Sequence, residues 1–264
     1  MIDFLLSLPL WALAIVLNVW LIGFALTSLL GLRRWILPRL RIDTDASLFL
    51  GAAVMQSAMV LFGLVAALTA VSVWTRHSQV ADTVSKEATA IAILWRDLGG
   101  YPEHDRDSMR GVLRGYTNQI IEEAWPMQRQ GKTPHMGVEW LDRFQAQLFA
   151  FEPTSESQKL LHAATLDAYK GMVEARRARV DSVHTELPSV MWVVLLPGAM
   201  GCLFLSLFFH IEDVRFQSFL MAGLAGFVAM VLFVIISLDR PFQGAMAIGA
   251  DSYQLIRDQL MSVN

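Results

Sequence analysis

Long runs of hydrophobic residues without a single charge divide the chain. Four such runs cover residues 4–30, 46–75, 187–211 and 216–238, and they contain 27, 30, 25 and 23 residues with no Asp, Glu, Lys or Arg. About 20 apolar residues, rising about 1.5 Å each, cross a hydrocarbon core of about 30 Å. Each run is therefore long enough to span a membrane, and the pattern predicts four transmembrane helices arranged as two hairpins.

The charged residues gather between the two hairpins. Residues 76–186 hold 14 of the 21 Lys and Arg and 16 of the 24 Asp and Glu. The whole chain is only 17% charged, below the roughly 25% of soluble domains. The sequence thus predicts four parts: a first transmembrane hairpin (1–75), a soluble domain (76–186), a second hairpin (187–238) and a C-terminal segment (239–264).

The soluble domain has a helical period. Apolar residues recur every three or four positions at Val84, Ala88, Ile91, Leu94 and Leu98, as on one face of an amphipathic helix. Nothing interrupts the chain before this stripe, so one helix is expected from about residue 47 to residue 98. Similar stripes follow, and Pro126 is expected to end the second helix of the domain. The predicted fold is an all-α integral membrane protein with an inserted helical bundle.

One face of the second span combines small and polar residues. They recur every three or four positions, so they share one side of the helix: Ala52, Gln56, Met59, Gly63, Ala66 and Ala70. Small residues allow helices to approach closely, and Gln can form a hydrogen bond across such a contact. The same residues could instead line a pore, whose wall needs only small side chains and a few neutral dipoles. Both interpretations stay open.

A second cluster lies where the fourth span ends. Its members combine two opposite charges, a helix-ending proline, an aromatic ring and a glycine: Asp239, Arg240, Pro241, Phe242 and Gly244. One interpretation is an interfacial stop in which the arginine reaches lipid headgroups. The other is a structural joint, in which Asp239 or Arg240 pairs with charges at the base of the soluble helices.

The sequence has no motif of an enzyme or of a cofactor site. It lacks a glycine-rich phosphate loop, a nucleophile elbow, a His-Glu-x-x-His motif and a Cys-x-x-Cys pair. No catalytic residue, metal site or cofactor is therefore predicted, and the soluble domain has no basic stripe for nucleic acid. The spans contain no ionisable residue except His210. Active transporters use such residues at mid-membrane, so a passive pore is favoured over active transport.

Charges flanking the spans bear on orientation. The loop between the first two spans carries Arg33, Arg34, Arg39 and Arg41, and short loops rich in Arg and Lys usually face the cytoplasm. This favours an external soluble domain. The domain's own membrane-proximal cations oppose it: Arg76, Lys86, Arg176, Arg177 and Arg179.

Several strings resemble the bacterial bestrophin-like family of four-helix membrane proteins. They occur at residues 71–74, 84–88, 94–96, 110–116 and 121–127, and the most specific one is Leu-Asp-Arg-Pro-Phe-x-Gly at 238–244. The resemblance covers most of the chain. With the arginines that follow later in the domain, these strings mark a motif expected at the base of the soluble helices: Trp74, Glu87, Trp95, Arg96, Glu123, Trp125, Pro126, Arg176 and Arg177.

The resemblance implies distant kinship with bestrophins, which are oligomeric anion channels with a pore lined by the second transmembrane helix. It thus implies a homo-oligomer in the bacterial inner membrane that passes small inorganic ions. Bestrophins keep the inserted domain cytoplasmic, in contrast to the orientation that the loop arginines favour. The alternative function is a non-conducting scaffold or sensor whose helical domain binds a partner.

Overall fold

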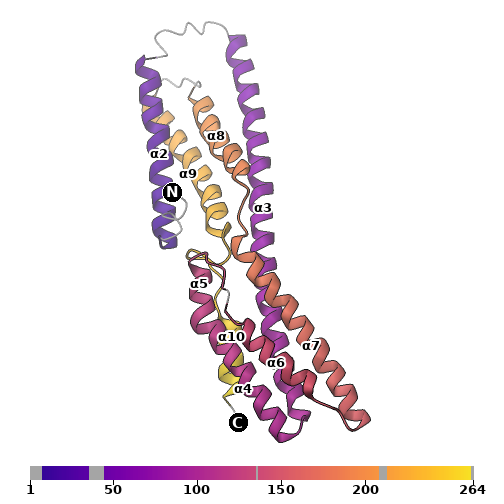
Figure 1. Ribbon diagram of the computed structural model, residues 1–264. Coiled ribbons are helices and arrows are strands. Elements are labelled where there is room, and N and C mark those ends of the chain that lie inside the picture. Colours follow the sequence, from indigo (N-terminus) through magenta and orange to yellow (C-terminus); the bar gives the residue numbers. More distant parts are fainter. Residues whose placement is uncertain (1–7, 36–44, 135, 208–212, 263–264) are drawn as a thin grey trace. The chain divides into compact units, whose positions relative to one another are not determined.

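The computed structural model describes residues 8–35, 45–134, 136–207 and 213–262 (Figure 1). All regular secondary structure in these residues is helical. This confirms the predicted all-α fold. The chain forms two compact units, Met1–Thr75 with Glu186–Asp239, and Arg76–Thr185 with Arg240–Asn264. We refer to them as the membrane unit and the soluble unit.

The membrane unit contains four helices that are long and apolar enough to cross a bilayer. They are α2 (Leu10–Trp35), the first half of α3 (Asp45–Asp97), α8 (Ser189–Ser206) and α9 (Val214–Leu238). The four predicted spans are therefore confirmed, and the protein is a membrane protein. Residues 4–7 and 208–211 of the predicted spans, and Arg39 and Arg41 of the first loop, lie outside the described residues.

The core of the membrane unit lies mainly between α2 and α9, which run side by side (Figure 1). On α2 the buried residues recur every fourth position and form one apolar stripe: Leu13, Leu17, Leu21, Ala25 and Leu29. This is the spacing that keeps side chains on one face of a helix. Helix α8 approaches α3 closely, because a Cβ added at Gly198 would lie 2.9 Å from the Phe62 ring.

The soluble unit is built from the second half of α3 and a set of shorter helices. They are η2 (Leu98–Gly100), α4 (Glu103–Gln119), η3 (Ile120–Ala124), α5 (Trp125–Arg129), α6 (Val138–Ala150), α7 (Glu156–Asp181), η4 (Ser182–His184), α10 (Asp251–Ile256) and η5 (Arg257–Met261). The predicted stripe of α3 forms part of its core, and Ile91, Leu94 and Leu98 are fully buried. The single long helix expected over residues 47–98 is confirmed.

The expectation for Pro126 was wrong. The chain stays helical past this residue, through the π-helical turn η3 and into α5, which ends at Arg129. Proline disrupts a helix because it lacks an N–H and its ring crowds the preceding turn. Here the preceding turn is widened, with the Trp125 N–H reaching back to the Ile120 carbonyl, and Pro126 falls in the first turn of α5. Both features accommodate the ring.

Candidate functional site

The membrane half of α3 is the least covered of the four spans. Only 11% of its most apolar 18-residue stretch is buried, compared with 28% for α2 and for α8 and 39% for α9. Gln56 and Gly63 of the predicted face are exposed, and Ala66 is buried. A span that its own subunit leaves open must be covered by lipid or by another subunit.

Part of the predicted face lines an apolar groove in the membrane unit. The groove has a volume of about 460 Å³ and runs between α3, α8 and α9. Four of the six predicted residues line it, namely Met59, Gly63, Ala66 and Ala70. Ala52 and Gln56 lie further along α3, on a shallow surface that they share with Met59. Of the six residues, Gln56 and Gly63 are exposed, Ala52, Met59 and Ala70 are half-buried, and Ala66 is buried against its own subunit.

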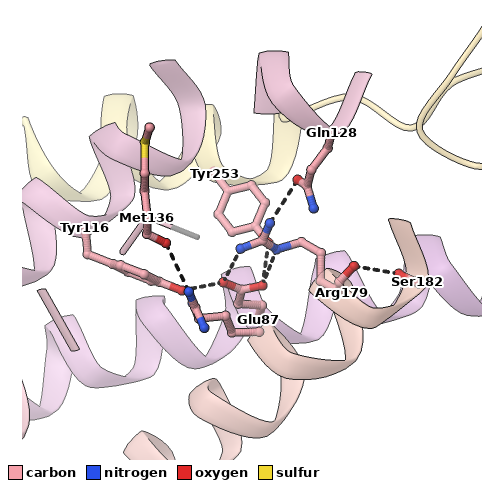
Figure 2. Close-up of polar contacts among 8 residues, drawn as sticks. Glu87, Tyr116, Gln128, Met136, Arg179, Ser182 and Tyr253 are labelled. Atoms are coloured by element: carbon pink, nitrogen blue, oxygen red, sulfur yellow. Dashed lines mark hydrogen bonds and ion pairs between the residues drawn. The ribbon is translucent and has the colours of Figure 1, made fainter. Parts of the chain in front are cut away.

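A buried cluster of polar side chains lies in the soluble unit, around Glu87 of α3 (Figure 2). Glu87 has no exposed surface, and Arg179 of α7 is 1% exposed. Arg179 Nε donates to Glu87 Oε2 at 2.6 Å and Arg179 Nη2 donates to Glu87 Oε1 at 3.2 Å. Such a two-point pair between a guanidinium and a carboxylate fixes both side chains in direction as well as distance.

Three further buried side chains complete this Glu87 cluster. The Tyr116 hydroxyl donates to Glu87 Oε1 at 2.7 Å, and the Tyr253 hydroxyl donates to Glu87 Oε2 at 3.0 Å. Arg179 Nη1 donates to Gln128 Oε1 at 2.9 Å. The carboxylate therefore accepts four hydrogen bonds from α4, α7 and α10. A buried charge is tolerated when it is paired and hydrogen-bonded in this way.

The electrostatics keep the two tyrosines neutral and the arginine charged. Burial, reinforced by the negative charge of Glu87, raises the pKa of Tyr116 and of Tyr253 well above the ordinary value. For Arg179, burial lowers the pKa, but the Glu87 carboxylate outweighs this and raises it above the ordinary value. Both phenols are therefore hydrogen-bond donors throughout the physiological pH range, and the ion pair stays formed.

Aromatic rings enclose the cluster. The Arg179 guanidinium carbon lies 5.7 Å from the centre of the Trp125 ring, a distance that allows a cation–π interaction. Trp125 also packs edge-on against Phe242, with 5.6 Å between ring centres, and its Nε1 donates to the Ile248 carbonyl at 3.3 Å. Phe242 of the predicted membrane-exit string thus belongs to the core of the soluble unit.

The remaining predicted base residues do not form one site. Trp95 is buried beneath Arg110, whose guanidinium carbon lies 4.8 Å from the ring centre. Arg176 donates to the Met136 carbonyl at 3.0 Å. The other five are exposed at the surface: Trp74, Arg96, Glu123, Pro126 and Arg177. Of the predicted base residues, Glu87 and Trp125 meet at the buried cluster, and the charge of Arg176 also acts on Tyr116.

Asp239 forms a separate contact within the membrane unit. It is 6% exposed, and its Oδ1 accepts a hydrogen bond of 2.6 Å from the Leu187 backbone N–H. This ties the end of α9 to the residues just before α8. Gly244 has a φ of +81°, which favours glycine, and Ile248 N donates to the Pro241 carbonyl at 2.8 Å. Asp239 thus contributes to the membrane unit, and Pro241 and Gly244 shape a turn of the soluble unit.

Replacing Asp239 with Ala should lower the stability of the membrane unit. The variant loses a buried hydrogen bond to a charged acceptor, worth about 1.5–3 kcal/mol, and leaves the Leu187 N–H unsatisfied. We expect a melting temperature in detergent roughly 3–12 °C lower. Asp82→Ala is the matched control, because Asp82 is exposed on α3. Equal melting of the two variants would contradict the assignment.

The sequence did not identify Arg179, Tyr116, Gln128 or Tyr253 as site residues. The sequence analysis counted Arg179 only among the membrane-proximal cations, although it lies seven residues beyond the buried Met172 on the same side of α7. Within the described residues, no three His, Cys, Asp or Glu side chains come together as a metal site requires.

Comparison with known proteins gives a consistent family and fold. The profile of the Bestrophin-like domain matches residues 19–253. No curated protein matches the chain in sequence. A crystal structure of a variant bacterial bestrophin homologue from Klebsiella pneumoniae is similar with a TM-score of 0.72 at 10% identity, covering 95% of this chain and 99% of that one. A crystal structure of a variant membrane protein gives 0.72 at 9% identity with the same coverage.

Proposed function

The chain belongs to the bestrophin-like family, and we propose that it is a homo-oligomeric passive channel for small anions, with α3 lining the path. The observation that carries this proposal is the open membrane half of α3, of which only 11% of the most apolar stretch is buried. In a ring of subunits, such a helix can border a central path while the better covered α2 and α9 pack within each subunit.

The chemistry of the open side suits a passive path. Gln56 supplies a neutral dipole on a mostly apolar span, and Gly63 leaves room, since a Cβ added there would meet nothing within 4 Å. Small side chains with a few dipoles are sufficient to line a hole that ions cross down their gradient. We infer that the pore side of α3 carries Ala52, Gln56, Met59 and Gly63.

The test is a combined measurement of mass and flux. The purified protein should have the mass of a closed oligomer in native mass spectrometry, and it should pass chloride when reconstituted into liposomes. A stable monomer would contradict the channel, because a single subunit has no enclosed path. An oligomer that passes no ion under any gradient would favour the scaffold function.

We further propose that the soluble unit faces outward from the bacterial inner membrane. The support is the arginine-rich first loop. One of the five opposing cations, Arg179, is buried in the ion pair with Glu87, so it adds no surface charge near the membrane. This weakens the case for a cytoplasmic soluble unit.

Orientation can be measured with an impermeant thiol reagent on intact cells. With Cys202 replaced by Ala, a cysteine at the exposed Ser108 should be labelled, whereas a cysteine at Thr44 in the first loop should be protected. Labelling after membrane permeabilisation is the control for both positions. The reverse pattern would place the soluble unit in the cytoplasm.

A further inference from the structure

The Glu87 cluster lies on the same unbroken helix as the proposed pore side. Helix α3 runs from Asp45 to Asp97 without interruption. Each residue of an α-helix turns the chain by about 100°, so the rotation of the helix about its axis decides which side chains face a given direction. Relative to Gln56, the exposed Leu61 and Leu68 point roughly 140° and 120° away. A rotated α3 would therefore present bulky aliphatic side chains in place of Gln56.

The membrane half of α3 has few contacts that could fix this rotation. Among residues 51–75, the buried side chains are Ala66, Thr69 and Val73. Thr69 bonds to the Val65 carbonyl of its own helix. Phe62 meets α8 at Gly198, and such apolar contacts give the helix a preferred face but tolerate small rotations better than hydrogen bonds do. Rotation is therefore only weakly set within this half.

The soluble half is fixed far more strongly. Eight side chains from Val80 to Leu98 are buried, and Glu87 is the one among them with a charge. Its carboxylate accepts hydrogen bonds from Arg179, Tyr116 and Tyr253, which come from three different helices (Figure 2). Hydrogen bonds weaken steeply when their angles change. Four of them converging on one carboxylate resist rotation in a way that apolar packing does not.

We propose that Glu87 is a positioning residue for the conduction path: its bonds to Arg179, Tyr116 and Tyr253 set the rotation of α3 and so select the side that its membrane half turns toward the neighbouring subunits. This inference rests on the proposed function. In this proposal the soluble unit determines which side chains of α3 line the path.

The test reads helix rotation by crosslinking between subunits. In a Cys202→Ala background, a cysteine is placed at Gln56 or at Val54, two exposed positions roughly 200° apart around the helix. A short bis-maleimide should crosslink the Gln56→Cys protein several-fold more than the Val54→Cys protein. The comparison is then repeated with Glu87→Leu and Arg179→Met combined, since replacing a buried ion pair by apolar residues commonly preserves stability.

The preference for position 56 should fall toward one-to-one in the double variant, with the oligomer mass retained. Tyr116→Phe combined with Tyr253→Phe removes two of the four hydrogen bonds but keeps both rings. This variant should show a crosslinking preference for position 56 between that of the parent and that of the double variant. If the Glu87→Leu, Arg179→Met protein does not assemble, the crosslinking preference of the Tyr116→Phe, Tyr253→Phe protein is the deciding measurement. An unchanged preference, or no crosslink at either position in the parent, would overturn the inference.

Crosslinking requires no ion flux, so the two proposals fail separately. If the parent protein conducts but the crosslinking preference for position 56 is unchanged in the cluster variants, only the proposed role of Glu87 is contradicted. If the parent passes no ion but the preference is lost when the cluster is disrupted, only the proposed channel function is contradicted.

Discussion

Replacement of Arg179 with Met should be one of the most destabilising single changes in this protein. The substitution leaves the Glu87 carboxylate, which has no exposed surface, without its counter-charge. Breaking a buried ion pair from one side costs about 3–5 kcal/mol. We expect a melting temperature roughly 6–20 °C lower than that of the parent, together with faster proteolysis within residues 76–185.

Two variants separate this effect from simple loss of an arginine. Arg177→Met removes a cation two residues away, whose Nε lies 3.9 Å from an Asp181 carboxylate oxygen on an exposed surface. Such pairs contribute at most about 1 kcal/mol, so this protein should melt close to the parent. Adding Glu87→Leu to Arg179→Met should recover part of the loss, because the unpaired charge is gone while the buried Tyr116 and Tyr253 hydroxyls lose their acceptor. A single variant as stable as the Arg177 control would mean that Glu87 is not buried as an ion.

The overall fold could be predicted because hydrophobicity and helical period point to the same structure. Charge-free runs identify the spans by length alone, and the stripe that includes Ile91 and Leu94 extends α3 far beyond the membrane. The course of the chain at Pro126 could not be read in the same way. A widened π turn depends on packing around Trp125, and no local pattern at residues 120–124 distinguishes it from an ordinary helix end.

The buried cluster left a signal in the sequence that is visible once two stripes are compared. Glu87 follows Val80 and Val84 and precedes Ile91 and Leu94 at helical spacing, so it occupies a core position of α3. A lone charge in a buried stripe requires an opposite charge in another one. The stripe of α7 contains one, at Arg179. What the sequence cannot supply is the pairing itself, since residues 76–186 contain 13 other Lys and Arg, and the tyrosine donors come from helices distant in the chain.

The role of the open α3 side was left undecided between packing and pore lining, and the structure sharpens the question. Gly63 and Gln56 are exposed, and a Cβ added at Gly63 would meet no atom of the subunit within 4 Å. Tight packing in the same chain is therefore not the reason for a glycine at position 63. Their function must be read from the assembled protein.

Replacement of Gly63 with Leu should abolish conduction while leaving the subunit folded. No atom lies within 4 Å of a Cβ at this position, so the position is open in the isolated subunit. In a ring it would project into the path or the adjoining groove, and we expect at least a tenfold loss of chloride flux from reconstituted liposomes. Gln56→Leu should have a smaller effect, a change in selectivity, because it removes a dipole without closing the hole.

The matched control for Gly63→Leu is Gly23→Leu on α2, where an added Cβ also meets nothing within 4 Å. Both variants add the same volume to an open position of a transmembrane helix, so both should retain the parent's mass and melting temperature. Only the α3 variant should lose flux if α3 borders the path. Equal conduction by both would show that ions cross elsewhere, and equal loss would indicate that added bulk disturbs the spans in general. A loss confined to Gly63 with the oligomer intact leaves obstruction of the path as the direct explanation, because the position is open in the subunit itself.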